Sequence, residues 1–142
     1  MYEKLTSFID TFEGMTDYGQ YTGWVEEFED GHKCFRAGII DYNDDINSFV
    51  YTVYDGFAGR EYMKTIDRLI NEANTDSIYD IDISGLNAAE VLSCLTGAVR
   101  AERFCEGALA EALHSGFITS CLKRLRELDT ELLPEKFLDC LH

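Results

Sequence analysis

The sequence predicts a mainly α fold, a single compact helical domain of five or six helices with a short β-hairpin near residues 22–37. Apolar residues recur at intervals of three and four over most of the 142 residues, which is the period of an amphipathic helix. One stretch instead alternates around an Asp30-Gly31 turn, which is typical of a hairpin. The single proline, Pro134, and the lack of a Pro/Ser-rich linker favour one domain, residues 1–142.

The N-terminal part is expected to hold two helices on either side of the hairpin. The first carries its apolar residues on one face and ends at Gly14. The hairpin would run from the alternating stretch around Trp24 into a return strand at residues 33–37. The second helix is expected over residues 41–55, with Asp41 as its N-cap.

The rest of the chain is expected to be helical except for a polar loop over residues 74–85. Asn87 and Glu90 have the spacing of a capping box, which predicts the start of a helix that continues to about Phe104. Pro134 suits the first turn of a short final helix. The expected helices of this part cover residues 60–73, 87–104, 108–114 and 117–128, and a short stretch from Pro134 to Leu141.

The charge of the chain is its most unusual property. It has 27 acidic and 12 basic residues, a formal net charge of -15. Residues 1–90 hold 19 acids and six bases (-13), and residues 91–142 hold eight acids and six bases (-2). We therefore expect an acidic N-terminal part and a near-neutral helical scaffold. Direct binding to nucleic acid or to an anionic membrane is not expected, since both need a basic surface.

The compartment is expected to be the cytoplasm. No apolar run of about 18 residues occurs, so no membrane span is expected. The N-terminus is charged and has no signal-peptide core. The five cysteines form no CxxC pair and no zinc spacing, so we expect buried reduced thiols and neither metal nor cofactor.

Acidic clusters are the first candidate site. A solvated face that keeps the protein soluble would explain them, and so would a surface that imitates the phosphates of a nucleic acid. In the second case a basic nucleic-acid-binding protein would be the partner. The candidate partner-binding residues are Glu26, Glu27, Glu29, Asp30, Asp41, Asp44 and Asp45.

Arg100, Glu102 and Arg103 are the second candidate. Arginines at i and i+3 share a helical face. An ion-pair network that fixes this helix against the acidic part would explain them, and so would a pocket for an anion, because arginine binds a carboxylate or phosphate through two parallel hydrogen bonds.

The run Arg100-Ala-Glu-Arg-Phe-Cys-Glu-Gly107, followed by Leu122-Lys-Arg-Leu-Arg-Glu-Leu128, resembles a family of small bacterial and phage proteins classed only as a domain of unknown function. The resemblance covers residues 87–128, with a looser likeness over residues 41–63. It implies a mostly helical fold, and it implies no activity and no site residue.

No catalytic motif of the GxSxG, HExxH, Walker or GxGxxG type occurs in the chain. The leading expectation is a non-catalytic protein-binding module, an acidic inhibitor that imitates nucleic acid, as an anti-CRISPR protein of a mobile element would. The first alternative is a structural or regulatory homodimer. The second is a small-anion binder or enzyme that uses Arg100 and Arg103.

Overall fold

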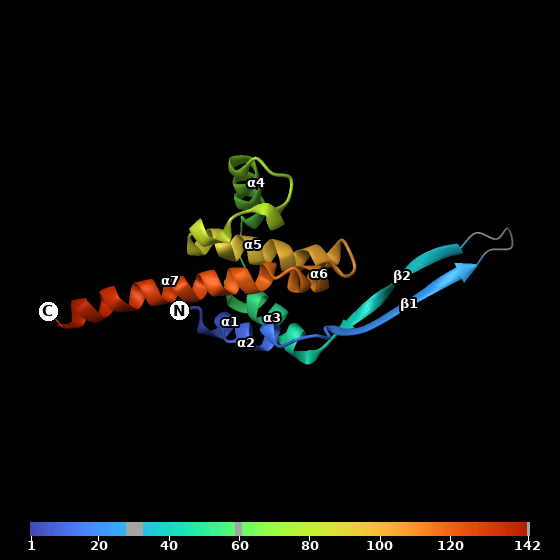
Figure 1. The fold of residues 1–142 in the computed structure, drawn as a ribbon, viewed down its shortest axis with the longest axis horizontal. Helices are drawn as coiled ribbons and strands as arrows, with labels where there is room; N and C mark the ends of the chain where they lie inside the picture. Colours follow the sequence, from blue (N-terminus) through green and yellow to red (C-terminus); the bar gives the residue numbers. More distant parts are fainter. Residues whose placement is uncertain (28–32, 59–60, 142) are drawn as a thin grey trace.

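The long C-terminal helix α7 (Phe117–Leu141) is the element against which the helical body packs (Figure 1). It contacts α1 (Glu3–Thr6), α2 (Phe8–Glu13), α5 (Ala88–Arg100) and α6 (Ala108–His114). α4 (Tyr62–Ala73) packs against α5. The inward face of α7 carries four fully buried residues at helical spacing: Ile118, Cys121, Leu122 and Leu125.

This computed structural model describes residues 1–27, 33–58 and 61–141, and the side chains of residues 1–20, 40–58 and 61–130. The predicted fold class is confirmed: the protein is mainly helical, with one two-stranded antiparallel hairpin. Short irregular turns join the helices: a π turn at Val53–Phe57 and 3-10 turns at Ile78–Asp80, Ile83–Gly85 and Ala101–Arg103.

An aromatic cluster joins the N-terminal helices to α3 (Asp44–Thr52). The ring of Phe49 lies edge-on to Phe12 at 5.0 Å and to Phe8 at 5.4 Å between centroids, an arrangement that aromatic quadrupoles favour. Phe49 is fully buried. This cluster anchors the segment that leads out of the hairpin to the helical body.

The hairpin is longer than the sequence predicted. β1 covers Gly19–Glu27 and β2 covers Lys33–Tyr42, and the pair extends away from the helices (Figure 1). The ladder runs from Gly19 opposite Tyr42 to Glu27 opposite Lys33, with a register shift between Thr22 and Trp24. Pairing continues past the alternating stretch because backbone hydrogen bonds hold the strands together where the side-chain pattern is irregular.

The sequence predicted Asp41 as the N-cap of the following helix, and this prediction is wrong. It lies in β2 opposite Gln20. Asn43 is the N-cap of α3, and its Oδ1 accepts a hydrogen bond from the backbone N–H of Ile46 at 3.1 Å. Both residue types cap well, and the extension of β2 to Tyr42 decides between them.

The C-terminal part also differs from the prediction. Instead of a separate short helix begun by Pro134, α7 runs without interruption from Phe117 to Leu141. A proline inside a helix removes one backbone hydrogen bond and costs about 3 kcal/mol, but it does not by itself force an end.

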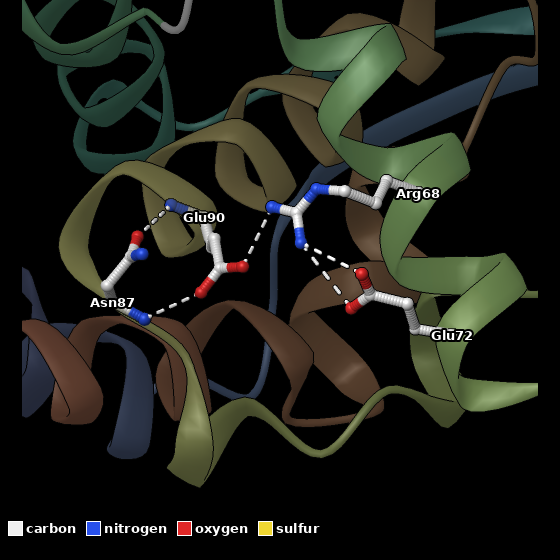
Figure 2. A network of polar contacts seen from close by, with 4 residues as sticks. All are labelled: Arg68, Glu72, Asn87 and Glu90. Atoms are coloured by element: carbon white, nitrogen blue, oxygen red, sulfur yellow. Dashed lines mark hydrogen bonds and ion pairs between the residues drawn. The ribbon is translucent and has the colours of Figure 1, made fainter.

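The capping box at the start of α5 is confirmed (Figure 2). Oδ1 of Asn87 accepts from the N–H of Glu90, and Oε1 of Glu90 accepts from the N–H of Asn87, both at 2.9 Å. Arg68 of α4 donates to Oε2 of Glu90 at 2.8 Å and also contacts Glu72. One carboxylate therefore both caps α5 and joins it to α4.

Candidate functional site

The base of the hairpin meets the turn between α5 and α6. The hydroxyl of Tyr42, the last residue of β2, donates to Oε1 of Glu102 at 2.5 Å, and it accepts from the N–H of Ala110 at 3.2 Å. Burial, and next the Glu102 carboxylate, raise the pKa of Tyr42 well above its usual value. The hydroxyl therefore stays protonated and able to donate at neutral pH.

Glu102 links three segments. Its Oε2 accepts from the N–H of Gly107 at 2.9 Å, and its Oε1 also accepts from the N–H of Leu109 at 3.0 Å. These amides begin α6, where the helix leaves N–H groups without a helical acceptor. The carboxylate thus stabilises the start of α6 and the end of β2 together.

The same turn makes a second contact with the hairpin. Oε2 of Glu106 accepts from the N–H of Ile40 in β2 at 3.5 Å. Gly107 follows with φ +89°, in the left-handed region, which glycine enters without a side-chain clash. The chain can therefore reverse into α6 while it remains against β2.

Arg100 and Arg103 point to different partners, although the sequence places them on one helical face. The guanidinium of Arg100 lies over the ring of Tyr62, and that of Arg103 over the ring of Tyr54, each at 5.5 Å from the centroid. The helix gives way to a 3-10 turn after Arg100, which separates the two side chains. No carboxylate among the described residues forms an ion pair with either of them.

The candidate acids are only partly placed. Asp41 is exposed in β2, and Asp44 and Asp45 are exposed in the first turn of α3. Glu26 and Glu27 lie in β1, opposite Cys34 and Lys33, and their side chains are not described. Glu29 and Asp30 lie outside the described residues.

Two further exposed acids lie beside Asp41, Asp44 and Asp45. Asp17 precedes β1, and its backbone oxygen accepts from Nδ2 of Asn43 at 3.1 Å. Glu106 reaches β2 as described above. We call Asp17, Asp41, Asp44, Asp45 and Glu106 the hairpin-base acids.

The hairpin-base acids have no ion pair within the described side chains, in contrast to several acids on the helical body. There Glu13 pairs with Lys123 at 2.6 Å, Glu90 with Arg68 at 2.8 Å and Glu127 with Arg124 at 3.3 Å. The hydrogen bond and charge of Lys123 lower the pKa of Glu13. Among the described side chains, the negative charge at the hairpin base therefore has no counter-ion.

The buried cysteines have the chemistry of core residues. Burial raises the pKa of the Cys94 thiol to about 11, and it also raises the pKa of the Cys121 thiol well above its usual value. Thiols of this kind are poor nucleophiles at neutral pH. Cys105, in contrast, is exposed.

The described residues contain neither a cluster of metal ligands nor a membrane-spanning helix. Nowhere among them do three His, Cys, Asp or Glu residues lie together as a metal site would need. None of the helices there has the length and apolar character of a membrane-spanning segment.

The candidate site residues predicted from the sequence included Glu102 but not Tyr42, Asp17 or Glu106. Tyr42 falls within the helix predicted over residues 41–55, and only the strand pairing places it at the end of β2. Glu102 lies five residues before Gly107, and this spacing by itself does not indicate that the carboxylate accepts from the glycine amide. The pairing of residues 60 positions apart cannot be read from local spacing.

Comparison with protein families matches residues 1–131 to a family of unknown function, DUF6508. The match covers the hairpin and the helical body, and is wider than the resemblance over residues 87–128. No curated protein matches the chain, and no solved structure does either.

Proposed function

The chain belongs to the family of unknown function DUF6508, and we propose that it is a non-catalytic module that binds a basic, nucleic-acid-handling protein through the hairpin and the hairpin-base acids. In this proposal the carboxylates take the place of nucleic acid phosphates in a basic groove. One observation carries it: five exposed acids gather at the hairpin base and none of them has an ion pair among the described side chains, whereas Glu13, Glu90 and Glu127 on the helical body do.

The form of the hairpin supports binding to a partner. A two-stranded hairpin alone in water is marginally stable, and this one extends beyond the helical body (Figure 1). Within the described residues each strand is paired on one side only. A partner that covers the ribbon would add the packing and hydrogen bonding that an isolated hairpin lacks.

Electrostatics would assist such binding. A region of one charge sign attracts an oppositely charged protein over about one Debye length, about 8 Å at physiological ionic strength, and raises the association rate. The net charge of -15 extends this attraction around the molecule. The hairpin base then fixes where the partner docks.

The same acids also have a local effect that a test must separate. Asp44 and Asp45 lie in the first turn of α3, where the helix dipole stabilises negative charge by about 0.3–1 kcal/mol. Loss of binding in a variant therefore has to be compared with its stability.

The experiment measures displacement of fluorescent DNA from basic DNA- and RNA-binding proteins of the source organism. A triple variant, Asp41→Asn, Asp44→Asn and Asp45→Asn, is compared with a control that neutralises Asp10, Asp55 and Asp76. The control acids are also exposed, and they form no ion pair among the described side chains, so the two variants change net charge equally.

We expect the wild-type protein and the control to displace DNA, with a potency that falls as salt rises. The triple variant should lose about tenfold in potency, since three peripheral charge pairs contribute about 0.2–1 kcal/mol each. Neutralising Glu26, Glu27, Glu29 and Asp30 tests the other candidate acids in the same assay.

Equal loss in the triple variant and the control would reduce the effect to net charge and contradict a specific site. If no basic protein is bound and light scattering finds a dimer that persists in 1 M salt, the homodimer alternative replaces the proposal. Charge pairs are strongly screened at that ionic strength, and apolar contacts are not.

A further inference from the structure

A pocket of about 250 Å³ lies between α4 and the C-terminal end of α5. It is separate from the hairpin base and is not part of the function proposed above. Its size is somewhat below that of typical ligand pockets, about 300–1,000 Å³. Most of its lining is apolar, and the residues that define it are Tyr62, Met63, Ile66, Gly97, Arg100 and Phe104.

Gly97 lines the pocket at the point where α4 and α5 pack together. A Cβ at this position would lie 2.4 Å from Cδ1 of Ile66, so α4 and α5 approach closely here. Any side chain at position 97 would have to displace Ile66, which itself lines the pocket. Glycine thus keeps the two helices close and leaves the space beside them unfilled.

Two large apolar side chains lie at this pocket in contact with solvent. Phe104 is 84% exposed and Met63 is 65% exposed. A single exposed apolar residue needs no explanation, but Met63 lies in α4 and Phe104 follows the 3-10 turn after α5, and both line the same hollow. An apolar ligand would cover both, and burial of apolar surface would favour its binding.

Arg100 gives the pocket one positive charge. Its Nε is buried and has no hydrogen-bond acceptor in the described structure, and its guanidinium rests on the ring of Tyr62. Arg68 and Arg124, by comparison, each hold a carboxylate. In a chain with 27 acids, a partly buried arginine whose Nε has no acceptor among the described residues stands out.

Asp67 is the other charged residue of the lining, and it is exposed. Its carboxylate would repel an anion and so favours one orientation, in which the ligand's charged end lies toward Arg100. Apolar walls with a single cation fit an apolar ligand that has one anionic end. They fit a phosphate or a sugar less well.

We propose that this pocket binds a small apolar monocarboxylate. The carboxylate accepts hydrogen bonds from the guanidinium of Arg100, and the apolar part lies against Ile66, Met63 and Phe104. Arginine suits the role because its planar donors match a carboxylate and because its charge persists at any physiological pH.

The test follows binding of 3-phenylpropionate to the full-length protein by backbone amide NMR, with 4-methylpentanoate as a branched aliphatic probe. Two further compounds separate the contribution of the charge from that of the apolar part. 3-Phenylpropanamide keeps the shape without the charge, and acetate keeps the charge without the apolar part. We expect saturable shifts at Gly97, Ala101 and Phe104 with a Kd below about 1 mM, and at least tenfold weaker binding of the amide and of acetate.

The protein variants give a second, independent comparison. Arg100→Gln should weaken 3-phenylpropionate binding about tenfold or more, as expected for loss of a charged hydrogen bond, and Phe104→Ser should weaken it severalfold. Arg103→Gln is the matched control, since Arg103 also lies over a tyrosine ring at 5.5 Å but does not line the pocket. It should bind as the wild type does.

Absence of saturable shifts at 10 mM for both apolar acids would overturn the proposal. So would equal affinity of acid and amide, a comparison that needs no substitution and is unaffected if Arg100→Gln folds poorly. An equal loss in Arg100→Gln and Arg103→Gln would assign the effect to net charge and would also contradict it.

Discussion

The hydroxyl of Tyr42 donates a hydrogen bond to the carboxylate of Glu102, and this contact joins the last residue of β2 to the turn between α5 and α6. The two residues are 60 positions apart. Since the same carboxylate accepts from two amides at the start of α6, movement of the hairpin base and of α6 should be coupled.

Replacing Tyr42 with phenylalanine should destabilise the protein and loosen the hairpin base. The change leaves the N–H of Ala110 without its acceptor and removes one donor from Glu102, so we expect a loss of about 1–3 kcal/mol in the free energy of unfolding. Urea denaturation measures it, and hydrogen exchange at the Ile40 amide reports on the hairpin. The control is Tyr51→Phe at a 69% exposed position, which should change stability little; equal losses would contradict the role of the contact.

The Tyr42 contact should also make stability fall at alkaline pH. The pKa of Tyr42 is raised in the folded protein, first by burial and next by Glu102. Above the unfolded value of about 10 the unfolded chain loses this proton while the folded chain keeps it, so the free energy of unfolding decreases as pH rises. The advantage of the wild type over Tyr42→Phe should shrink between pH 10 and 12 in denaturant titrations. A constant difference would mean that the hydroxyl titrates alike in both states.

Glu90→Gln should weaken the joint between α4 and α5. Glutamine can still accept from the Asn87 amide but loses the charge that pairs with Arg68, so we expect a loss of about 1 kcal/mol at pH 7. Glu72→Gln is the matched control. Glu72 contacts the same arginine, but its side chain is 62% exposed, so its loss should lower stability less. Thermal unfolding of both variants makes the comparison.

The Glu90 effect should disappear in acid. Its backbone hydrogen bond with Asn87, and next Arg68, lower its pKa below the usual 4.5. A lowered pKa gives stability that is present above the unfolded value and lost as pH falls through the folded one. The wild type and Glu90→Gln should therefore converge below pH 4.5. If the difference persists at pH 2.5, its origin is packing and not charge.

Gly107→Ala should be costly because of backbone conformation. At φ +89° an L side chain is strained, and the added Cβ would lie 3.4 Å from Cδ1 of Ile40. We expect a loss of about 1–2 kcal/mol and weaker protection of the Ile40 amide. Gly85→Ala has no atom within 4 Å of the added Cβ and no positive φ. This control should be nearly neutral by the same urea titration.

Among the cysteines whose side chains are described, Cys105 should react first. It is exposed, whereas burial raises the pKa of Cys94 to about 11 and raises that of Cys121 well above its usual value. In a Cys34→Ser, Cys140→Ser background, one thiol should label quickly with an aromatic disulfide at pH 8 and two only on unfolding. Mass spectrometry identifies the labelled residue, and rapid labelling of Cys94 would show that α5 opens readily.

Local sequence signals predicted the parts of the fold that depend on neighbours in the chain. The capping box of Asn87 and Glu90 and the helical spacing of Leu122 and Leu125 are properties of one helix, so they could be read directly. The hairpin was predicted, but its length and the N-cap at Asn43 were not, and the predicted Asp30-Gly31 turn lies outside the described residues. Where two strands stop pairing depends on both strands at once.

The sequence by itself determined the fold class and the excess of negative charge, because helical periodicity and composition are carried by single residues and their near neighbours. Tertiary structure alone decided that Glu102 meets Tyr42, that Arg100 and Arg103 rest on different tyrosine rings, and that the hairpin-base acids lie together with no ion pair among the described side chains. These are distances between residues far apart in the chain. They follow from the packing of α5, α6 and the hairpin, which no local pattern encodes.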